Sequence, residues 1–193
     1  MTSPDLISAL MPVIEALDAL GVRCYVGGSV ASSIHGVPRA SIDADVIAEL
    51  GADHVAPLAA RLRSTFYLDE DRMRDAVERR LSFNVIHLAT MFKVDIFVSK
   101  GRPFDLEALT RARLDALGSA PDAPKAKVAS PEDTVLAKLD WFRRGGESSE
   151  QQWADVVGLL RARAHQLDQG YLGRWAGTLG VADLLERAFG QAS

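Results

Sequence analysis

The sequence predicts an α+β fold in which a mixed sheet flanked by helices is followed by an all-helical C-terminal region. In the first ~115 residues, segments with strand-like alternation of apolar residues are interspersed with segments of helical periodicity. In the last ~65 residues only the helical periodicity recurs. Residues 118–127, rich in glycine, proline and serine, are typical of a linker. We therefore expect two domains, 1–117 and 118–193, with the helical region packed on the first.

The first predicted helix covers residues 5–20, because apolar residues from Leu6 to Leu20 recur on one helical face. Pro12 lies inside this pattern, so the helix either kinks there or begins nearby, and Gly21 ends it. Further strands are predicted over 22–26, 41–48, 82–88 and 92–98, and further helices over 30–35, 53–64, 69–80 and 106–113. The short link between the last two strands predicts an antiparallel hairpin.

The helical region has a well-marked start. Ser130 is a typical N-cap, Pro131 suits the first helical position, and Asp133 follows the cap by three residues. Gly145 and Gly146 end this predicted helix. Further apolar periodicity predicts helices over 153–164, 171–179 and 181–189.

Composition and charge exclude several function classes. With 193 residues, of which 48% are hydrophobic, the chain can bury a core without a metal or disulfide staple. The formal net charge of −4 argues against binding to nucleic acid by bulk charge alone, although it leaves a local basic groove open. The one cysteine allows no intramolecular disulfide and favours a reducing compartment, so we expect a cytoplasmic protein. We expect neither a signal peptide nor a membrane span.

Two aspartates in the predicted strand 41–48 are the first candidates for chemistry. Asp43 and Asp45 are two residues apart, so their carboxylates share one face at a separation of roughly 6.6 Å along the strand. Ile42, Ala44 and Val46 are expected to be buried on the opposite face. Like charges at this distance repel each other unless solvent or a cation lies between them. Oxygen ligands at this spacing suit Mg²⁺, which shares its shell with substrate phosphates.

Asp95 lies in a second apolar strand and is the third candidate. Val94 and Ile96 point to one face, which leaves Asp95 and Lys93 on the other. If this strand lies beside the first, three carboxylates meet on one surface and can hold two metal ions. Asp95 is also able to take the proton of an attacking hydroxyl. An ion pair between Lys93 and Asp95 is an equally open interpretation.

A glycine-rich turn precedes these strands. Gly27 and Gly28 allow backbone N–H groups to approach a phosphate, and the helix that follows adds a favourable dipole. The hydroxyl of Ser29 is a further donor. The turn has neither the P-loop pattern nor the GxGxxG dinucleotide pattern.

In this order, the motifs resemble those of the DNA polymerase β-like nucleotidyltransferase superfamily. The matching residues are Gly27-Gly28-Ser29, Gly36-x-x-Arg39, Ser41-Ile42-Asp43-Ala44-Asp45-Val46 and the hydrophobic-flanked Asp95. Within that superfamily the chain is similar to small bacterial nucleotidyltransferases of the AbiEii toxin type. That similarity covers the segments 83–87, 92–97, 130–138, 171–175 and 184–186. The resemblance implies a nucleotidyltransferase core.

The resemblance also implies an activity. Such an enzyme binds a nucleoside triphosphate and Mg²⁺, and an acceptor hydroxyl or the end of an RNA such as tRNA attacks the α-phosphorus. Carried over by position, the triphosphate is held by Gly27, Gly28 and Ser29, and Lys138 matches a lysine that contacts it. The metal ions are held by the catalytic Asp43, Asp45 and Asp95, and Arg39 is placed to reach phosphate or acceptor. A toxin of this type implies a cognate antitoxin as protein partner.

Plainer interpretations stay open for several of these residues. Lys138 lies beside the apolar face of its helix, where a solvated, snorkelling lysine is common. Arg39 in an exposed loop has no necessary role. Asp155, which matches a further acid of the family, is equally consistent with a surface charge. Trp141 and the other two tryptophans fall on predicted helices, which favours core packing over stacking on a base.

Two alternative functions also stay open. The first is transfer of a nucleotide to a small molecule, as in the similar antibiotic nucleotidyltransferases. The second is a catalytically silent module that binds a nucleotide or a partner protein.

Overall fold

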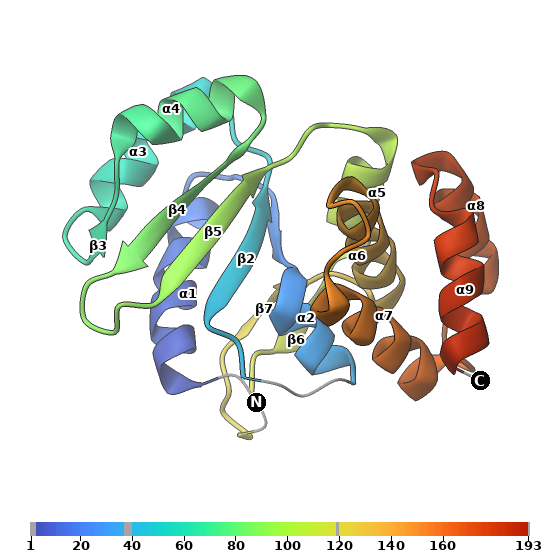
Figure 1. The fold of residues 1–193 in the computed structure, drawn as a ribbon. Coiled ribbons are helices and arrows are strands. Elements are labelled where there is room, and N and C mark those ends of the chain that lie inside the picture. Colours follow the sequence, from blue (N-terminus) through green and yellow to red (C-terminus); the bar gives the residue numbers. More distant parts are fainter. Residues whose placement is uncertain (1–2, 37–39, 119, 193) are drawn as a thin grey trace.

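A computed structural model describes residues 3–36, 40–118 and 120–192, which form a seven-stranded mixed sheet flanked by helices (Figure 1). The strands are β1 Cys24–Val26, β2 Asp43–Ala48, β3 Phe66–Tyr67, β4 Ser82–His87, β5 Lys93–Val98, β6 Arg113–Ala116 and β7 Lys125–Val128. The helices are α1 Pro4–Ala19, α2 Gly28–His35, α3 Ala52–Leu62, α4 Glu70–Arg79, α5 Pro103–Arg111, α6 Pro131–Arg144, α7 Glu150–Arg163, α8 Gln169–Leu179 and α9 Ala182–Ala192. This arrangement confirms the predicted α+β class with a helical C-terminal region.

The strand order is β3-β4-β5-β2-β1-β7-β6, so β2 and β5 lie at the centre of the sheet. These two strands run parallel, whereas β1 is antiparallel to β2 and β4 is antiparallel to β5. The antiparallel pair β4–β5 is the predicted hairpin. Burial alternates residue by residue along both central strands, as the period of a strand requires. One face of the strands is therefore core, where α1 contacts β1, β2 and β5, and the other is free to carry polar groups.

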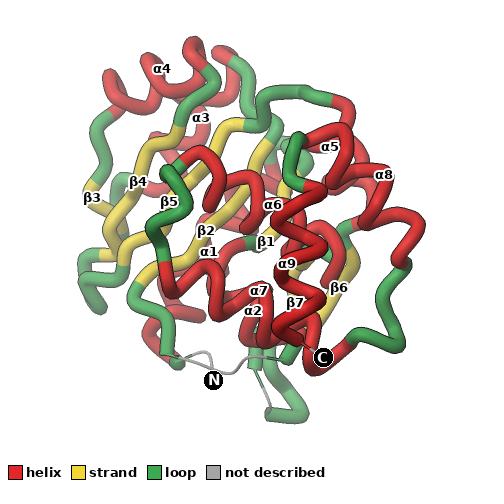
Figure 2. Tube along the Cα trace, turned by 45° about the vertical axis from the view of Figure 1, so that its right-hand side comes forward, coloured by secondary structure: helices red, strands yellow, loops and turns green. Residues whose placement is uncertain are grey.

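Two hydrophobic clusters hold the molecule together. The sheet cluster contains buried residues from Leu6 to Ala129, contributed by the sheet and by α1 to α5. The helical cluster contains Phe104 of α5 and buried residues from Val135 to Ala188 of α6 to α9. α2 connects the two parts, because it contacts β2 on one side and α6 and α7 on the other (Figure 2). The division into domains at residues 117 and 118 stays a prediction.

Three details differ from the sequence prediction. The proposed linker 118–127 overlaps strand β7, which pairs parallel to β1 at Val26↔Val128 and antiparallel to β6. Its short sequence of alternating lysine and small apolar residues is too brief to be recognised from periodicity. The predicted helix 106–113 instead begins at Pro103 and ends at Arg111, and strand β6 begins at Arg113. The first helix begins at Pro4 after its N-cap Ser3, so the alternative start near Pro12 is wrong.

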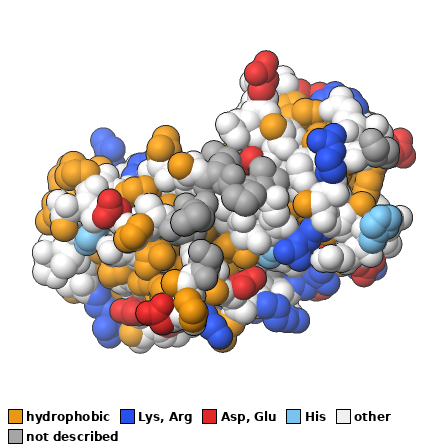
Figure 3. Space-filling model, turned by 90° about the horizontal axis from the view of Figure 1, so that it is seen from below, with side chains coloured by type: hydrophobic (Ala, Val, Ile, Leu, Met, Phe, Trp, Pro, Cys, Tyr) orange, Lys and Arg blue, Asp and Glu red, His pale blue; other side chains and the backbone are white. Residues whose placement is uncertain are grey.

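Ile42 is the clearest error in the predicted burial pattern. It is 86% exposed, whereas the sequence predicts a buried side chain. The reason is that the pairing of β2 begins only at Asp43, so the alternation of the strand does not extend to the residue before it. Leu88 and Met91, next to the hairpin turn, are also exposed. Figure 3 shows hydrophobic side chains gathered on the face seen from below.

Among the described residues, no helix combines the length and the apolar character needed to cross a membrane.

Candidate active site

The parallel register of β2 and β5 places four charged side chains on one face of the sheet. Asp43 is paired with Lys93, and Asp45 is paired with Asp95. Residues two apart in a strand point to the same face, so the four side chains form a compact square. The structure therefore confirms that the strand of Asp95 lies beside the strand of Asp43 and Asp45, with all three carboxylates on one face.

Lys93 forms ion pairs inside this square. Its Nζ lies 2.6 Å from Asp95 Oδ2 and 3.7 Å from Asp43 Oδ2. The hydrogen bond to Asp95 raises the pKa of Lys93, so the ammonium is charged at neutral pH. The ion pair that the sequence left open is thus present, and it involves two of the three carboxylates.

Asp45 lies against the glycine-rich turn. Gly28 has a φ of 54°, and a Cβ at this position would lie 1.6 Å from Asp45 Oδ2. Gly27 donates its backbone N–H to the carbonyl oxygen of Asp45 at 2.9 Å. The turn and the aspartate therefore form one unit in which only glycine fits at position 28.

The environment of Asp45 disfavours its ionised form. Burial, followed by repulsion from Asp43 and Asp95, raises the pKa of Asp45 to about 6. In the part of the chain that the structure describes, its side chain has no hydrogen bond or ion pair. A carboxylate in this state is stabilised by an additional cation.

Ser29 provides the second unsatisfied group. It lies in the first turn of α2, is 6% exposed, and its buried hydroxyl has no hydrogen-bond partner among the described residues. A buried donor without a partner is unfavourable in a folded protein. At a helix N-terminus it is well placed to bind an anion together with the backbone N–H groups.

The donor set fits a hard divalent cation. The three carboxylates and one ammonium carry a net charge of −3 + 1 = −2. All of the carboxylate ligands are oxygens, as Mg²⁺ prefers. The side chains are not gathered in a finished coordination geometry, since no three potential ligands among the described residues lie close enough to hold a metal. The residues therefore fit magnesium by their chemistry, while the ammonium of Lys93 takes a position among them.

A cleft of about 710 Å³ lies between this face of the sheet and helices α5 and α6. It brings together most of the residues that the sequence singled out, namely Gly27, Gly28, Ser29, Asp43, Asp45 and Lys138. Neither Asp95 nor Lys93 lines its walls, although both lie on the same face of the sheet as Asp43 and Asp45. Arg39, which the sequence assigned to phosphate or acceptor, lies outside the described residues.

Lys138 is neither solvated nor snorkelling. It is 7% exposed, and its Nζ lies 2.8 Å from Oδ2 of Asp155, which is 1% exposed. The interpretation of Asp155 as a surface charge is therefore wrong as well. The pair joins α6 to α7 and presents an ammonium at the wall of the cleft.

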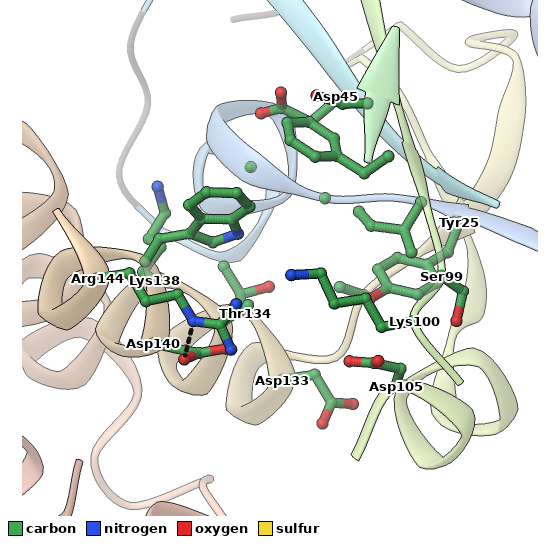
Figure 4. A pocket seen from close by; sticks show the side chains of 18 of the residues that line it. Tyr25, Asp45, Ser99, Lys100, Asp105, Asp133, Thr134, Lys138, Asp140 and Arg144 are labelled. Atoms are coloured by element: carbon green, nitrogen blue, oxygen red, sulfur yellow. Dashed lines mark hydrogen bonds and ion pairs between the residues drawn. The ribbon is translucent and has the colours of Figure 1, made fainter. Parts of the chain in front are cut away.

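The wall opposite the sheet, formed by α5 and α6, contains charged residues that the sequence analysis did not propose as site residues. Figure 4 shows Asp45 on one side of the cleft and Asp105, Asp133 and Asp140 on the other, with Lys100 between them. These three acids have partners: Asp105 with Arg102, Asp140 with Arg102 and Arg144, and Asp133 with Ser130, Tyr171 and Arg111. The sequence signals for them are local: Asp133 is the acid three residues after the N-cap Ser130, and Asp140 and Arg144 have i,i+4 spacing on α6.

Two basic residues and one tryptophan on the walls have a different character. Arg80 donates to the carbonyl oxygen of Ser99 at 2.9 Å, and neither Arg80 nor Lys100 forms an ion pair within the described ranges. Trp141 is 50% exposed and packs edge-to-face against Phe97, with 5.7 Å between ring centroids. The expectation that this tryptophan belongs to the core is wrong, because its position on α6 faces the cleft.

Comparison with known proteins identifies the fold. No family model and no curated protein matches the sequence. Solved structures do match. The antibiotic-resistance factor ANT(2'')-Ia is 12% identical with a TM-score of 0.55, covering 94% of this chain and 91% of that chain. Its complex with adenylyl-2''-tobramycin is 13% identical with a TM-score of 0.55, covering 90% and 96%.

A third similar structure is an antigenic nucleotidyltransferase-like protein from Paracoccidioides brasiliensis. It is 16% identical with a TM-score of 0.56, covering 98% of this chain and 94% of that chain. At these identities the likeness concerns the fold. The chain therefore has a nucleotidyltransferase-like fold over nearly its whole length.

Proposed function

We propose that this protein is a Mg²⁺-dependent nucleotidyltransferase, which moves a nucleoside monophosphate from a nucleoside triphosphate to an acceptor hydroxyl. The observation that carries the proposal is the contact between Asp45 and the glycine turn at Gly28, which sets a metal-ligand candidate beside a phosphate-binding candidate. Among the described residues, the carboxylate of Asp45 has no cationic partner and the buried hydroxyl of Ser29 has no hydrogen-bond partner. A metal–triphosphate complex supplies both the cation and the anion.

The reaction follows from these groups. The acceptor oxygen forms a bond to the α-phosphorus, the bond to the bridging oxygen breaks, and pyrophosphate leaves. Gly27, Gly28 and Ser29 would bind the triphosphate through N–H and O–H donors. Asp43, Asp45 and Asp95 would hold magnesium, which supplies charge neutralisation on the phosphates and activates the hydroxyl. Asp95 is the candidate acceptor of the hydroxyl proton.

Lys138 suits a role toward phosphate as well. An ammonium has three donors, and the ion pair with Asp155 uses one of them. Its position at the cleft wall leaves the others for an anionic ligand. Arg39 keeps its sequence-based assignment to phosphate or acceptor.

The charges around the rest of the cleft favour an anionic acceptor, such as the end of a tRNA or another RNA. The carboxylates of Asp105 and Asp140 are neutralised by guanidinium groups, whereas Arg80 and Lys100 are not paired in the described part of the chain. That region of the cleft therefore carries an excess of positive charge. The exposed ring of Trp141 adds a flat surface on which a base can stack.

A narrower proposal is that the protein is the toxin of an AbiEii-type toxin–antitoxin pair. It is supported by the sequence resemblance over segments 83–97 and 130–138. Expression of the chain should then arrest growth, the Asp45→Asn variant should not, and a cognate antitoxin should relieve the arrest. Equal arrest by both chains contradicts an enzymatic toxin.

The proposed activity is tested by label transfer. The purified protein is incubated with Mg²⁺, each of the four α-labelled nucleoside triphosphates, and either total tRNA or an aminoglycoside. We expect label on tRNA, no label with Asp45→Asn, and normal transfer with Asp75→Asn, which changes an exposed acid of α4. Lys100→Met should raise the KM for tRNA and leave the KM for the nucleotide unchanged.

The remaining outcomes separate the alternatives. Label on the aminoglycoside alone identifies a small-molecule transferase. Tight nucleotide binding without transfer to either acceptor identifies a silent binding module. Full activity of Asp45→Asn rejects the proposed chemistry.

A further inference from the structure

The square of charges on β2 and β5 contains its own cation. Lys93 is paired across the sheet with Asp43 and lies two residues before Asp95 on the same strand face. Its ammonium is 2.6 Å from Asp95 and 3.7 Å from Asp43, so it bridges the two strands. Asp45 is the carboxylate that this ammonium does not pair with.

This position is the one that a divalent cation needs. A metal ion held by Asp43 and Asp95 must lie within about 2.1 Å of an oxygen from each. An ammonium held at 2.6 Å from one of these oxygens cannot stay there at the same time. The two cations therefore compete for the same carboxylates.

We propose that Lys93 is a resident counter-ion that occupies the cation position between Asp43 and Asp95 until a divalent metal displaces it. The inference rests on the proposed function, because it concerns the same metal-binding carboxylates. It makes Lys93 a residue that sets metal affinity: the metal ion alone binds weakly, since it must first break two ion pairs.

The ammonium of Lys93 can leave its position between the carboxylates by a rotation of its side chain. It is 41% exposed, and a lysine stem has four rotatable methylene groups, so the ammonium can turn to solvent without a change in the backbone. Once displaced, it is a free cation at the edge of a site that takes a triphosphate. Arrival of the metal together with an anionic nucleotide therefore offsets the loss of the ion pairs better than arrival of the metal alone.

A purely structural role makes a different prediction. If Lys93 only stabilises the sheet, its removal lowers stability by the same amount with or without metal. If it is a counter-ion in competition with metal, its removal lowers stability without metal but changes it little in saturating metal, where the ammonium has already been displaced. The dependence of the loss on metal therefore distinguishes the two roles.

The test uses the full-length Lys93→Met variant, which keeps the length of the side chain and removes its charge. Binding of Mn²⁺ is followed by the loss of the free-ion magnetic resonance signal, without nucleotide, because Mn²⁺ takes the same oxygen ligands as Mg²⁺. We expect Lys93→Met to bind Mn²⁺ at least tenfold more tightly than the unaltered protein. Lys93→Arg should resemble the unaltered protein, as should the control Lys127→Met, which alters an exposed lysine of β7.

Thermal unfolding provides a second readout. The Tm of Lys93→Met should lie below that of the unaltered protein in EDTA and close to it in saturating Mn²⁺. Equal Mn²⁺ affinities, or a Tm lowered by the same amount in both solutions, overturns the inference. So does the absence of Mn²⁺ binding in every variant.

The failure of this inference is distinguishable from the failure of the proposed function. If Asp45→Asn loses Mn²⁺ binding while Lys93→Met leaves it unchanged, the proposed metal site is supported and the counter-ion role of Lys93 is rejected. Transfer of label to an acceptor is judged separately.

Discussion

The two walls of the cleft differ in how their charged groups are paired: one wall is formed by helices α5 and α6, and the other by the sheet. On the helical wall, Lys138 and Asp155 are both buried and satisfy each other at 2.8 Å. On the sheet wall, Asp45 lies beside two further carboxylates, and within the described residues nothing pairs with it. The charges of the helical wall are therefore paired within the fold, whereas Asp45 on the sheet wall has no such partner. Under the proposed function, this contrast separates residues that hold the site in shape from the candidate metal ligands.

The contrast also follows from the packing. The helical cluster joins α6 and α7 through apolar contacts, and the buried ion pair lies at that junction, where water cannot compensate an unpaired charge. On the sheet wall, Asp43 and Asp45 line the cleft, and burial together with mutual repulsion disfavours the ionised form of Asp45. Removing an acid should therefore have opposite effects on stability at the two walls.

The largest effect is expected at the helical wall. Asp155→Asn leaves the ammonium of Lys138 buried without its counter-charge, which should lower the free energy of unfolding by about 3–5 kcal/mol. Urea unfolding at pH 7 measures it. The exposed pair of Arg143 and Asp183 is the matched control, and Asp183→Asn should leave stability nearly unchanged. Similar small losses of stability in both variants would show that the buried ion pair contributes no more than an exposed one, and would contradict the proposed difference between the walls.

The next effect concerns the contact between the glycine turn and the sheet wall. Gly28→Ala places a methyl group on the carboxylate of Asp45 at a positive φ, which should cost about 2–4 kcal/mol and abolish transfer. Gly21→Ala is the control, because its φ is +68° and the space around it is open. That variant should lose only about 1 kcal/mol. Equal losses at the two glycines would show that the contact with Asp45 is unimportant.

The smallest effect should have the opposite sign. Because the pKa of Asp45 is raised to about 6, the stability it contributes is present below pH ~3.9, its unfolded value, and is lost as the pH rises through 6. In EDTA at pH 7, Asp45→Asn should therefore raise the free energy of unfolding by about 1–3 kcal/mol. At pH 4 the gain should approach zero. A destabilised variant at pH 7 would place Asp45 with the paired acids of the helical wall.

The sequence was informative where the requirement is local. The start of α6 at Ser130 and Pro131 follows from cap chemistry, and the side chain of Ser130 does accept the N–H of Asp133. The face shared by Asp43 and Asp45 follows from the period of a strand. The glycine turn ends β1 and opens α2 at the predicted place.

The sequence was uninformative where the requirement is distant. Strand β7 has no apolar run of its own and is recognised only by its pairing with β1 and β6. Ile42 was misplaced because the first pair of β2 depends on where β5 begins. The burial of Lys138 depends on Asp155 from another helix, which neither helix reveals by itself.

The sequence by itself therefore determined the α+β class, the glycine turn and the candidate carboxylates, because steric and periodic constraints act within a few residues. The tertiary structure decided which of these groups meet. It paired β2 with β5 in a register that sets Asp45 beside Asp95 and Lys93 beside Asp43. It also packed α5 and α6 across the cleft, where guanidinium groups neutralise the acids of the helical wall, while Asp45 on the sheet wall has no partner among the described residues. Such choices depend on the burial of apolar surface summed over the whole chain, and no single segment encodes that sum.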